Sequence, residues 1–212
     1  MFDRVLEAYG LTDNCTTIPF GNGLINRTWK VTCGEEAYIL QRLNHQVFVN
    51  PQAIANNISN IQHYLQEHYP HYNLPTPIKN KSGDTILHLP EDGYYRVIPF
   101  VKDSHSVDAA SSTRQAYEAA LSFGRFTHLL SPFDAKGLQI TLPNFHNLTL
   151  RYQQFEEAVR TGNQERIAQT KDLIKELQAH QYIAQAYQSI CTSDDFKVRV
   201  THHDTKISNV LF

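Results

Sequence analysis

The chain has 212 residues, of which 41% are hydrophobic and 19% are charged, enough for one large or two small domains with a substantial core. Its formal net charge of -2 implies no general attraction to nucleic acid or to an acidic membrane surface, so a small-molecule partner fits better. The N-terminal stretch MFDRVLEAYGL is too polar for a signal peptide, and no apolar run approaches the roughly 20 residues that span a bilayer. These features predict a cytoplasmic protein.

The first hundred residues are strand-rich around one helix. Residues 2–11 have apolar side chains at helical spacing, and the β-like runs CTTIPF, TWKVTC and EAYILQRL follow. Asn50 and Pro51 form a helix start, because Asn is a common cap and Pro suits the first helical position. TILHL, PEDG and YYRVIPFV then predict a hairpin, in which we expect Arg96 to extend to solvent while the tyrosines before it pack.

The second half is helical. From Asp108 onward the apolar spacing predicts a buried helix, and TLPNFHNLTLRY predicts a loop that leads to a second one. Apolar residues between Ile167 and Ile190 predict one long helix, and FKVRV predicts a short strand before the chain's last residues. The expected fold class is therefore α+β.

The terminal stretch THHDTKISNVLF fits H-x-D-x-x-x-x-N, the spacing of the catalytic loop that kinases use for phosphoryl transfer. Asp204 would orient an attacking hydroxyl and accept its proton. Asn209 would offer a neutral oxygen to Mg²⁺, and Lys206 would stabilise charge that develops on the transferred group.

Each motif has a simpler interpretation when taken alone. The terminal stretch also fits an ordinary polar loop, or a zinc site from His202, His203 and Asp204, although adjacent side chains rarely converge on one ion. The segment GNGLIN suits a tight hairpin turn as well as a phosphate-binding loop, in which glycines let backbone N–H groups approach the phosphates. The order of the parts favours a two-lobed kinase: strands around a glycine turn, a helix, a hairpin, a helical half and then HHDTKISN.

From roughly residue 15 to its end, the chain resembles the aminoglycoside phosphotransferase and choline kinase superfamily, small-molecule kinases with a protein-kinase-like fold. The segments FGNGLINRTWKV, AYILQRLN with VFVNP, LPNFHNLTLRY and THHDTKISNVLF together resemble the branch that contains N-acetylhexosamine 1-kinase. The resemblance implies a nucleotide-binding lobe with its hinge at 1–101, a partial helical lobe at 102–212, and ATP and Mg²⁺ as cofactors. It also implies that Asp204 is the catalytic base and Asn209 a magnesium ligand. The glycine turn over the phosphates and the hinge backbone at the adenine are implied as nucleotide contacts: Gly21, Asn22, Gly23, Pro99, Phe100 and Val101.

The sequence departs from the kinase pattern on its third strand, where a lysine or arginine normally binds the α- and β-phosphates. By alternation the matching position is Gln41, and Arg42 points the other way. Either the register is shifted so that Arg42 serves, or Arg27 or Lys30 supplies the cation. The helix after Pro51 likewise carries asparagines where a partner glutamate is usual.

A second departure is the end of the chain, three residues after Asn209. Kinases of this fold place a metal-binding aspartate roughly a dozen or more residues beyond the catalytic loop. We therefore expect a fragment of a longer kinase that phosphorylates poorly, and a turnover of at least about 1 per second would contradict this. An exposed apolar surface left by such a truncation is expected to favour self-association.

The acceptor is assigned by resemblance alone, as an N-acetylhexosamine that yields a 1-phosphate. Asn144, His146 and Arg151 are candidate acceptor contacts, because a donor-rich loop suits sugar hydroxyls and arginine suits phosphate, although such a loop is often a plain connection. Choline, an aminoglycoside or homoserine remain open as acceptors. A non-catalytic, pseudokinase-like nucleotide-binding module is the alternative from another class.

The three cysteines, Cys15, Cys33 and Cys191, are far apart and have no CxxC spacing. This pattern indicates neither a disulfide framework nor a zinc site. We expect three reduced thiols.

Overall fold

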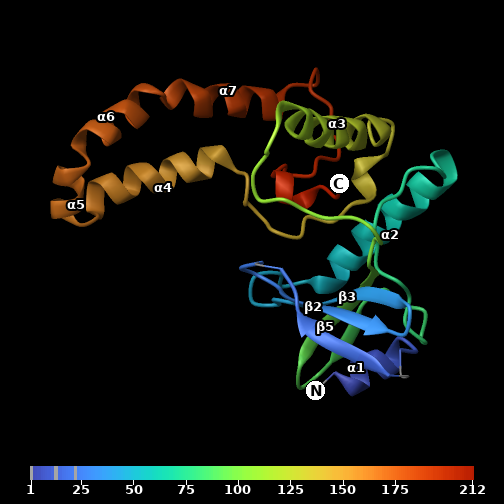
Figure 1. Ribbon diagram of the computed structural model, residues 1–212. Helices are drawn as coiled ribbons and strands as arrows, with labels where there is room; N and C mark the ends of the chain where they lie inside the picture. Colours follow the sequence, from blue (N-terminus) through green and yellow to red (C-terminus); the bar gives the residue numbers. More distant parts are fainter. Residues whose placement is uncertain (1, 12–13, 22) are drawn as a thin grey trace. The chain divides into compact units, whose positions relative to one another are not determined.

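The computed structural model describes residues 2–11, 14–21 and 23–212 (Figure 1). The chain forms two compact units, one from residues 1–141 together with 199–212, and one from residues 142–198. No helix in the described ranges is both long enough and apolar enough to cross a membrane.

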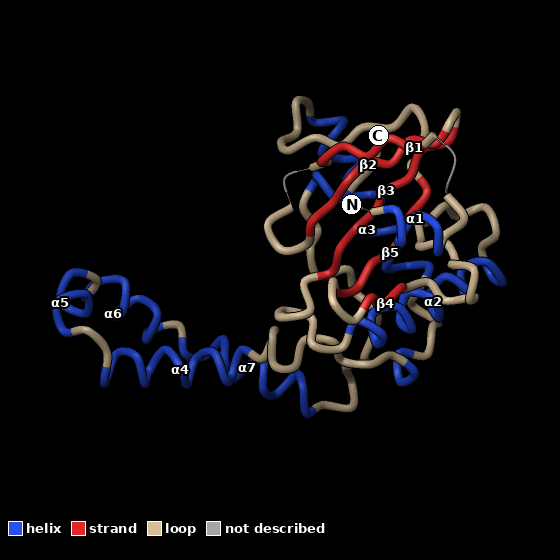
Figure 2. Tube along the Cα trace, turned by 90° about the horizontal axis from the view of Figure 1, so that it is seen from below, coloured by secondary structure: helices blue, strands red, loops and turns tan. Residues whose placement is uncertain are grey.

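The larger unit is built on a five-stranded antiparallel sheet with strand order β1-β2-β3-β5-β4 (Figure 2). Its strands are β1 (Cys15–Pro19), β2 (Arg27–Cys33), β3 (Glu36–Leu43), β4 (Leu87–Leu89) and β5 (Gly93–Pro99). The three β-like runs and the hairpin predicted from the sequence are thereby confirmed. The sheet lobe followed by helices confirms the α+β class.

The short helix α1 (Asp3–Ala8) covers one face of this sheet, which we call the outer face. Val5 and Leu6 of α1 form a buried cluster with Val31, Leu40 and other residues of that face. The phenol of Tyr9 joins this cluster and donates a hydrogen bond to the carbonyl of Tyr95 at 3.2 Å. The part of the outer face under α1 is therefore an apolar core.

The opposite face, which we call the inner face, meets helix α2 (Pro51–His68). Leu43 and Tyr94 of this face pack with Ala55 of α2. The side chain of Asn50 accepts a hydrogen bond from the Ala53 N–H at 3.1 Å, so the predicted cap is confirmed. The C-terminal half of α2 contributes Leu65 to a second cluster, which includes residues from the end of α3 (Thr113–Leu129) and from the segment before the terminal loop. Helix α2 thus contacts both the sheet and α3.

Two predictions about the helical half are wrong. Helix α3 buries only Ala119 and Leu129 among its residues, while Tyr117 is 64% exposed. The predicted short strand at FKVRV is irregular backbone and pairs with no strand in the described part of the chain; Val198 is 86% exposed, and only Val200 of the segment is buried. Apolar spacing marks a face that suits burial, but burial also needs an element to cover that face.

The smaller unit contains four helices, α4 (Leu148–Thr161), α5 (Gln164–Gln169), α6 (Lys171–Ala179) and α7 (Gln181–Thr192). Helices α4 and α7 are joined by a hydrogen bond from the hydroxyl of Thr149 to Gln188 at 3.0 Å. The predicted single long helix is thus divided into three. At the breaks, the side chains of Thr170 and His180 each lie 2.8 Å from a carbonyl oxygen of the preceding turn, in competition with the helical backbone bonds.

Cys15 and Cys33 form a disulfide, so the expectation of three reduced thiols is wrong. The two residues are directly opposed partners of the β1–β2 ladder, where facing side chains lie close together. The two cysteines are 18 residues apart in the sequence, a spacing that does not by itself predict a disulfide. The register of the two strands brings the sulfur atoms together. Cys191 is a free, exposed thiol.

Candidate active site

The terminal loop holds Asp204 and Asn209 in direct contact. The amide nitrogen of Asn209 donates to the backbone carbonyl of Asp204 and to its carboxylate Oδ2, each at 2.8 Å. A single 3-10 turn, η2 (Ile207–Asn209), with Lys206 as its cap residue, returns the chain from Asp204 to Asn209. The bonds to the amide nitrogen leave the amide carbonyl oxygen of Asn209 for another partner. Asp204 and Lys206 are exposed to solvent.

Aromatic contacts anchor this loop to the larger unit. The ring of His202 lies 5.2 Å from Phe123 and 6.0 Å from Phe126, both on α3. His203 has a φ of 61°, a conformation that few non-glycine residues adopt, and its Nε2 lies 2.6 Å from the hydroxyl of Thr201. Among the residues that the structure describes, no group of three potential ligands is placed to hold a metal, so the zinc alternative finds no support.

The glycine turn connects β1 to β2. Gly21 has a φ of +73°, and a Cβ at this position would meet nothing within 4 Å; Gly23 follows in the turn, and Asn22 lies outside the described residues. The turn begins where the Phe20 N–H donates to the Thr28 carbonyl at 3.0 Å. Near its other end, the side chain of Asn26 accepts from the Asn44 N–H at 3.0 Å. Both ends of the turn are therefore tied to the sheet.

The predicted hinge leaves the sheet at the end of β5. Pro99 is the last residue of β5, and the Phe100 N–H donates to the Ala37 carbonyl at 2.9 Å. The ammonium group of Lys30 lies 3.9 Å from the centroid of the Phe100 ring, and Val101 is 40% exposed. The hinge backbone is thus tied to β3, and the cation of Lys30 lies at the hinge.

Gln41 lies on the inner face and is held from two sides. Its side-chain oxygen accepts from Nε of Arg96 at 2.9 Å and from an Nη of Arg96 at 2.6 Å. Its side-chain nitrogen donates to the hydroxyl of Thr28 at 3.2 Å. The expectation that Arg96 extends to solvent is therefore wrong. Arg96 is the cross-strand partner of Gln41, and burial of the guanidinium lowers the pKa of Arg96 to about 10.

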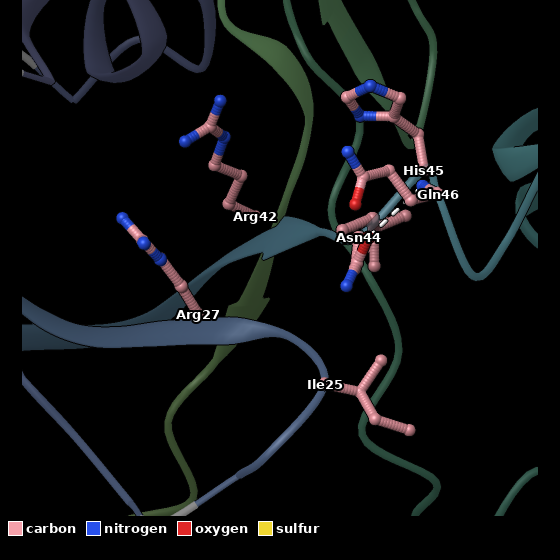
Figure 3. A pocket seen from close by; sticks show the side chains of 7 residues that line it. Ile25, Arg27, Arg42, Asn44, His45 and Gln46 are labelled. Carbon is pink, nitrogen blue, oxygen red and sulfur yellow. Dashed lines mark hydrogen bonds between the residues drawn. The ribbon is translucent and has the colours of Figure 1, made fainter.

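Arg42 and Arg27 lie on the outer face. Arg42 is the cross-strand partner of Tyr95, which belongs to the buried cluster under α1, and Arg27 is the cross-strand partner of Arg42. Arg42 forms a salt bridge with Asp92 at 3.2 Å and also donates to its backbone carbonyl. Both guanidinium groups point the same way beside a pocket of about 260 Å³ (Figure 3). The register is the one expected from alternation, so the alternative of a shifted register that turns Arg42 to the face of Gln41 is wrong.

The candidate acceptor residues lie in the smaller unit, whereas Asp204 belongs to the larger one. Arg151 donates to the backbone carbonyl of Asn144 at 3.3 Å and to Gln154 at 2.9 Å, so Asn144 and Arg151 are neighbours. The ring of His146 lies 4.7 Å from Phe145, which is 57% exposed. A role for Asn144, His146 and Arg151 in acceptor binding remains a prediction.

Sequence reasoning missed Thr28 and Arg96 as members of the site. Alternation along β5 places Arg96 on the same face as Tyr94 and Ile98, but it does not say which residue of β3 faces it. Arg96 and Gln41 are 55 residues apart in the sequence, and only the register between β3 and β5 brings them together.

The model of the phosphotransferase enzyme family matches residues 16–212. The crystal structure of a spectinomycin phosphotransferase in complex with ADP and spectinomycin aligns with 100% of this chain, at a TM-score of 0.64 and 13% identity. This chain covers 64% of the length of that protein. An aminoglycoside phosphotransferase solved with ADP and hygromycin B aligns over 62% of this chain and 38% of its own, with 15% identity and a TM-score of 0.36, too low to support an argument.

At 13% identity, the alignment to the spectinomycin phosphotransferase establishes a shared fold and nothing about substrate. The family match covers nearly the whole chain, including the glycine turn and the terminal loop with Asp204 and Asn209. The chain belongs to the phosphotransferase enzyme family.

Proposed function

We propose that this chain is the nucleotide-binding and catalytic-loop part of an ATP- and Mg²⁺-dependent kinase that phosphorylates a hydroxyl group of a small molecule. The observation that carries the proposal is the contact between Asp204 and Asn209 in a family member whose terminal loop has the H-x-D-x-x-x-x-N spacing. In this arrangement one loop presents a carboxylate and an amide oxygen to the same small region.

Asp204 is the proposed catalytic base. Its exposed carboxylate has one oxygen, Oδ2, engaged by Asn209, which fixes its orientation and leaves Oδ1 for the hydroxyl of an acceptor. The carboxylate orients that hydroxyl for attack in line on the γ-phosphate and takes its proton. Lys206, also exposed, places a positive charge near the transferred group.

The residues present fit a magnesium ion. Hard cations prefer oxygen ligands, and the amide oxygen of Asn209 is left available because the amide nitrogen donates to Asp204. Asn209 would hold the ion, which when bound neutralises charge on the phosphate oxygens.

The nucleotide contacts are proposed for the glycine turn and the hinge. Gly21 and Gly23, with Asn22 between them, would place backbone N–H groups over the phosphates, supported by the ties of this turn to Thr28 and Asn44. The hinge backbone from Pro99 through Phe100 to Val101 would hydrogen-bond the adenine. Gln41, on the inner face between them, would contact the phosphates.

For the acceptor, we propose an N-acetylhexosamine that is phosphorylated at its anomeric hydroxyl. This rests on the resemblance of the PNFH segment and the H-x-D-T-K-x-x-N loop to N-acetylhexosamine 1-kinases. An aminoglycoside is the main alternative, because the spectinomycin phosphotransferase that shares this fold was solved with spectinomycin, an antibiotic, as its ligand.

The test is phosphorus NMR of the chain with ATP, Mg²⁺ and, in turn, N-acetylglucosamine, N-acetylgalactosamine, choline and kanamycin. A new phosphomonoester signal with one acceptor identifies the substrate class. We expect Asp204→Asn to reduce the rate of its appearance by about 100- to 10,000-fold, because a positioned general base contributes an acceleration of that order. The matched control, Asp195→Asn, changes an exposed aspartate of the smaller unit and should leave the rate unchanged.

An unchanged rate in Asp204→Asn would overturn the role of this carboxylate. Intact ATP with every acceptor, together with measurable ADP binding, would instead support the alternative of a non-catalytic nucleotide-binding module. The observation that favours this alternative is Gln41, which places a neutral side chain where kinases usually carry a cation.

A further inference from the structure

The inner face of the sheet carries a buried positive charge without a carboxylate partner. In the described part of the chain, Arg96 forms no salt bridge, and its hydrogen-bond acceptor is the neutral side-chain oxygen of Gln41. Arg96 as a residue is half-buried, while its guanidinium lies deep enough for burial to lower the pKa of this group to about 10. A desolvated cation is unfavourable unless it is paired, so an arginine in this situation is suited to an anionic ligand.

The position of Arg96 connects it to the glycine turn. Arg96 bonds Gln41, Gln41 bonds the hydroxyl of Thr28, and the carbonyl of Thr28 accepts from the N–H of Phe20, where the turn begins. These bonds join strands β5, β3 and β2 to the loop between β1 and β2. A guanidinium so linked lies on the face from which the proposed nucleotide would be bound.

The other nearby cations are engaged elsewhere. Arg42 and Arg27 are on the outer face, and Arg42 pairs with Asp92. Lys30 is on the inner face, but its ammonium lies over the ring of Phe100 at the hinge. Among the described residues, Arg96 is therefore the basic residue that contacts Gln41, and Gln41 occupies the third-strand position where kinases usually carry a cation.

We propose that Arg96, on β5, supplies the positive charge that binds the α- and β-phosphates of the nucleotide, with Gln41 positioning its guanidinium. In this proposal the phosphate-binding cation lies on β5, directly opposite the third-strand position where kinases usually carry it. This inference rests on the proposed function, because it assumes that a nucleotide occupies the site. Two N–H groups of Arg96 are used by Gln41, and a guanidinium has five, so donors remain for phosphate oxygens.

The experiment compares the affinities of the chain for ADP with Mg²⁺ and for adenosine by isothermal titration calorimetry. Arg96→Met removes the charge and keeps a long side chain. We expect it to weaken ADP binding by about 10- to 100-fold and to leave adenosine binding unchanged, because charge-assisted hydrogen bonds to phosphate are lost. Arg27→Met, the same change on the outer face, should alter neither affinity. Lys30→Met should change the affinities for ADP and for adenosine by the same factor, because the ammonium of Lys30 lies at the hinge, where the adenine is proposed to bind.

A variant that moves the positive charge to another residue distinguishes a loss of phosphate binding from a general structural effect. Gln41→Lys combined with Arg96→Met returns the cation to the third strand and should restore most of the ADP affinity relative to adenosine. If Arg96→Met alone does not fold, Arg96→Gln supplies an uncharged polar side chain for the same comparison. An ADP-to-adenosine affinity ratio that stays at the wild-type value in a folded variant with no charge at position 96 and with Gln41 unchanged overturns the inference alone. A wild-type chain that binds neither ADP nor adenosine overturns the proposed function as well.

Discussion

At the scale of single residues, the two faces of the sheet differ in whether their arginine has a carboxylate partner. On the outer face, Arg42 is compensated by Asp92, and the hydroxyl of Tyr95 donates to the same carboxylate at 2.8 Å. On the inner face, within the ranges that the structure describes, Arg96 has a neutral hydrogen-bond acceptor, the side-chain oxygen of Gln41, and no salt bridge. The outer-face group is a self-sufficient structural pair, whereas the inner-face group is electrostatically incomplete.

The outer-face pair predicts a pH dependence of stability. Burial, and then the hydrogen bond to Asp92, raises the pKa of Tyr95 to about 12 from an ordinary value of 10.0. The folded state keeps this proton at pH values where the unfolded state loses it, so the stabilisation is fully present below pH 10.0 and is lost as pH rises towards about 12. The lowered pKa of Arg96 acts in the opposite direction over the same range.

The contribution of Tyr95 is isolated by comparing the wild type with Tyr95→Phe. Urea unfolding is followed through Trp29, the single tryptophan, between about pH 9 and about pH 11.5. We expect the difference in free energy of unfolding between the two proteins to shrink as pH rises. Tyr117→Phe, at an exposed position on α3, is the control and should differ from wild type by a constant amount. A constant difference for Tyr95→Phe would contradict the assignment.

At the scale of elements, the β1–β2 hairpin is held by more than its hydrogen bonds. The Cys15–Cys33 disulfide closes the end of the ladder away from the glycine turn. At the other end, Phe20 and Asn26 tie the turn to Thr28 and Asn44. The proposed phosphate-binding turn therefore belongs to a hairpin that is fastened at both ends.

The disulfide predicts a redox dependence of stability. Reduction, or Cys15→Ser with Cys33→Ser, should lower the free energy of unfolding by about 3 kcal/mol, because a closed loop of this size restricts the unfolded chain. The measurement is urea unfolding with and without reductant. Cys191→Ser, which removes the free exposed thiol, should behave as wild type in both conditions. Alkylation of three thiols in the untreated folded protein would contradict the presence of the bond.

At the scale of the whole molecule, the chain consists of two units joined through two crossings. The second crossing, near residues 198 and 199, runs through irregular backbone between α7 and the buried Val200. Exposed backbone outside helices and strands is where proteases act first. The helices of the smaller unit and the sheet of the larger unit should be cut more slowly.

Limited trypsin digestion checks this organisation. We expect the earliest cleavage after Lys197 or Arg199, which are both exposed in this segment, as identified by mass spectrometry at short times. Lys30, within the sheet, should be protected. Replacing both positions, by Lys197→Gln with Arg199→Gln, should delay the appearance of the first fragments. A first cut within β2 or within α4 would contradict the division into units.

The sequence by itself determined the local parts of this protein. The strands and α2 follow from short-range periodicity and from a cap at Asn50, and Asp204 and Asn209 share one loop of contiguous residues. Such features depend on neighbours in the chain, so a pattern of a few residues is enough to predict them.

Only the tertiary structure decided which distant residues meet. The Cys15–Cys33 bond and the Arg96–Gln41 contact both arise from strand register, and a shift of one residue would turn each side chain to the opposite face. Register is set by the packing of α1 and α2 against the two faces of the sheet, which no local pattern contains. For this reason the sequence left the source of the phosphate-binding cation open among Arg42, Arg27 and Lys30, whereas the folded sheet points to Arg96.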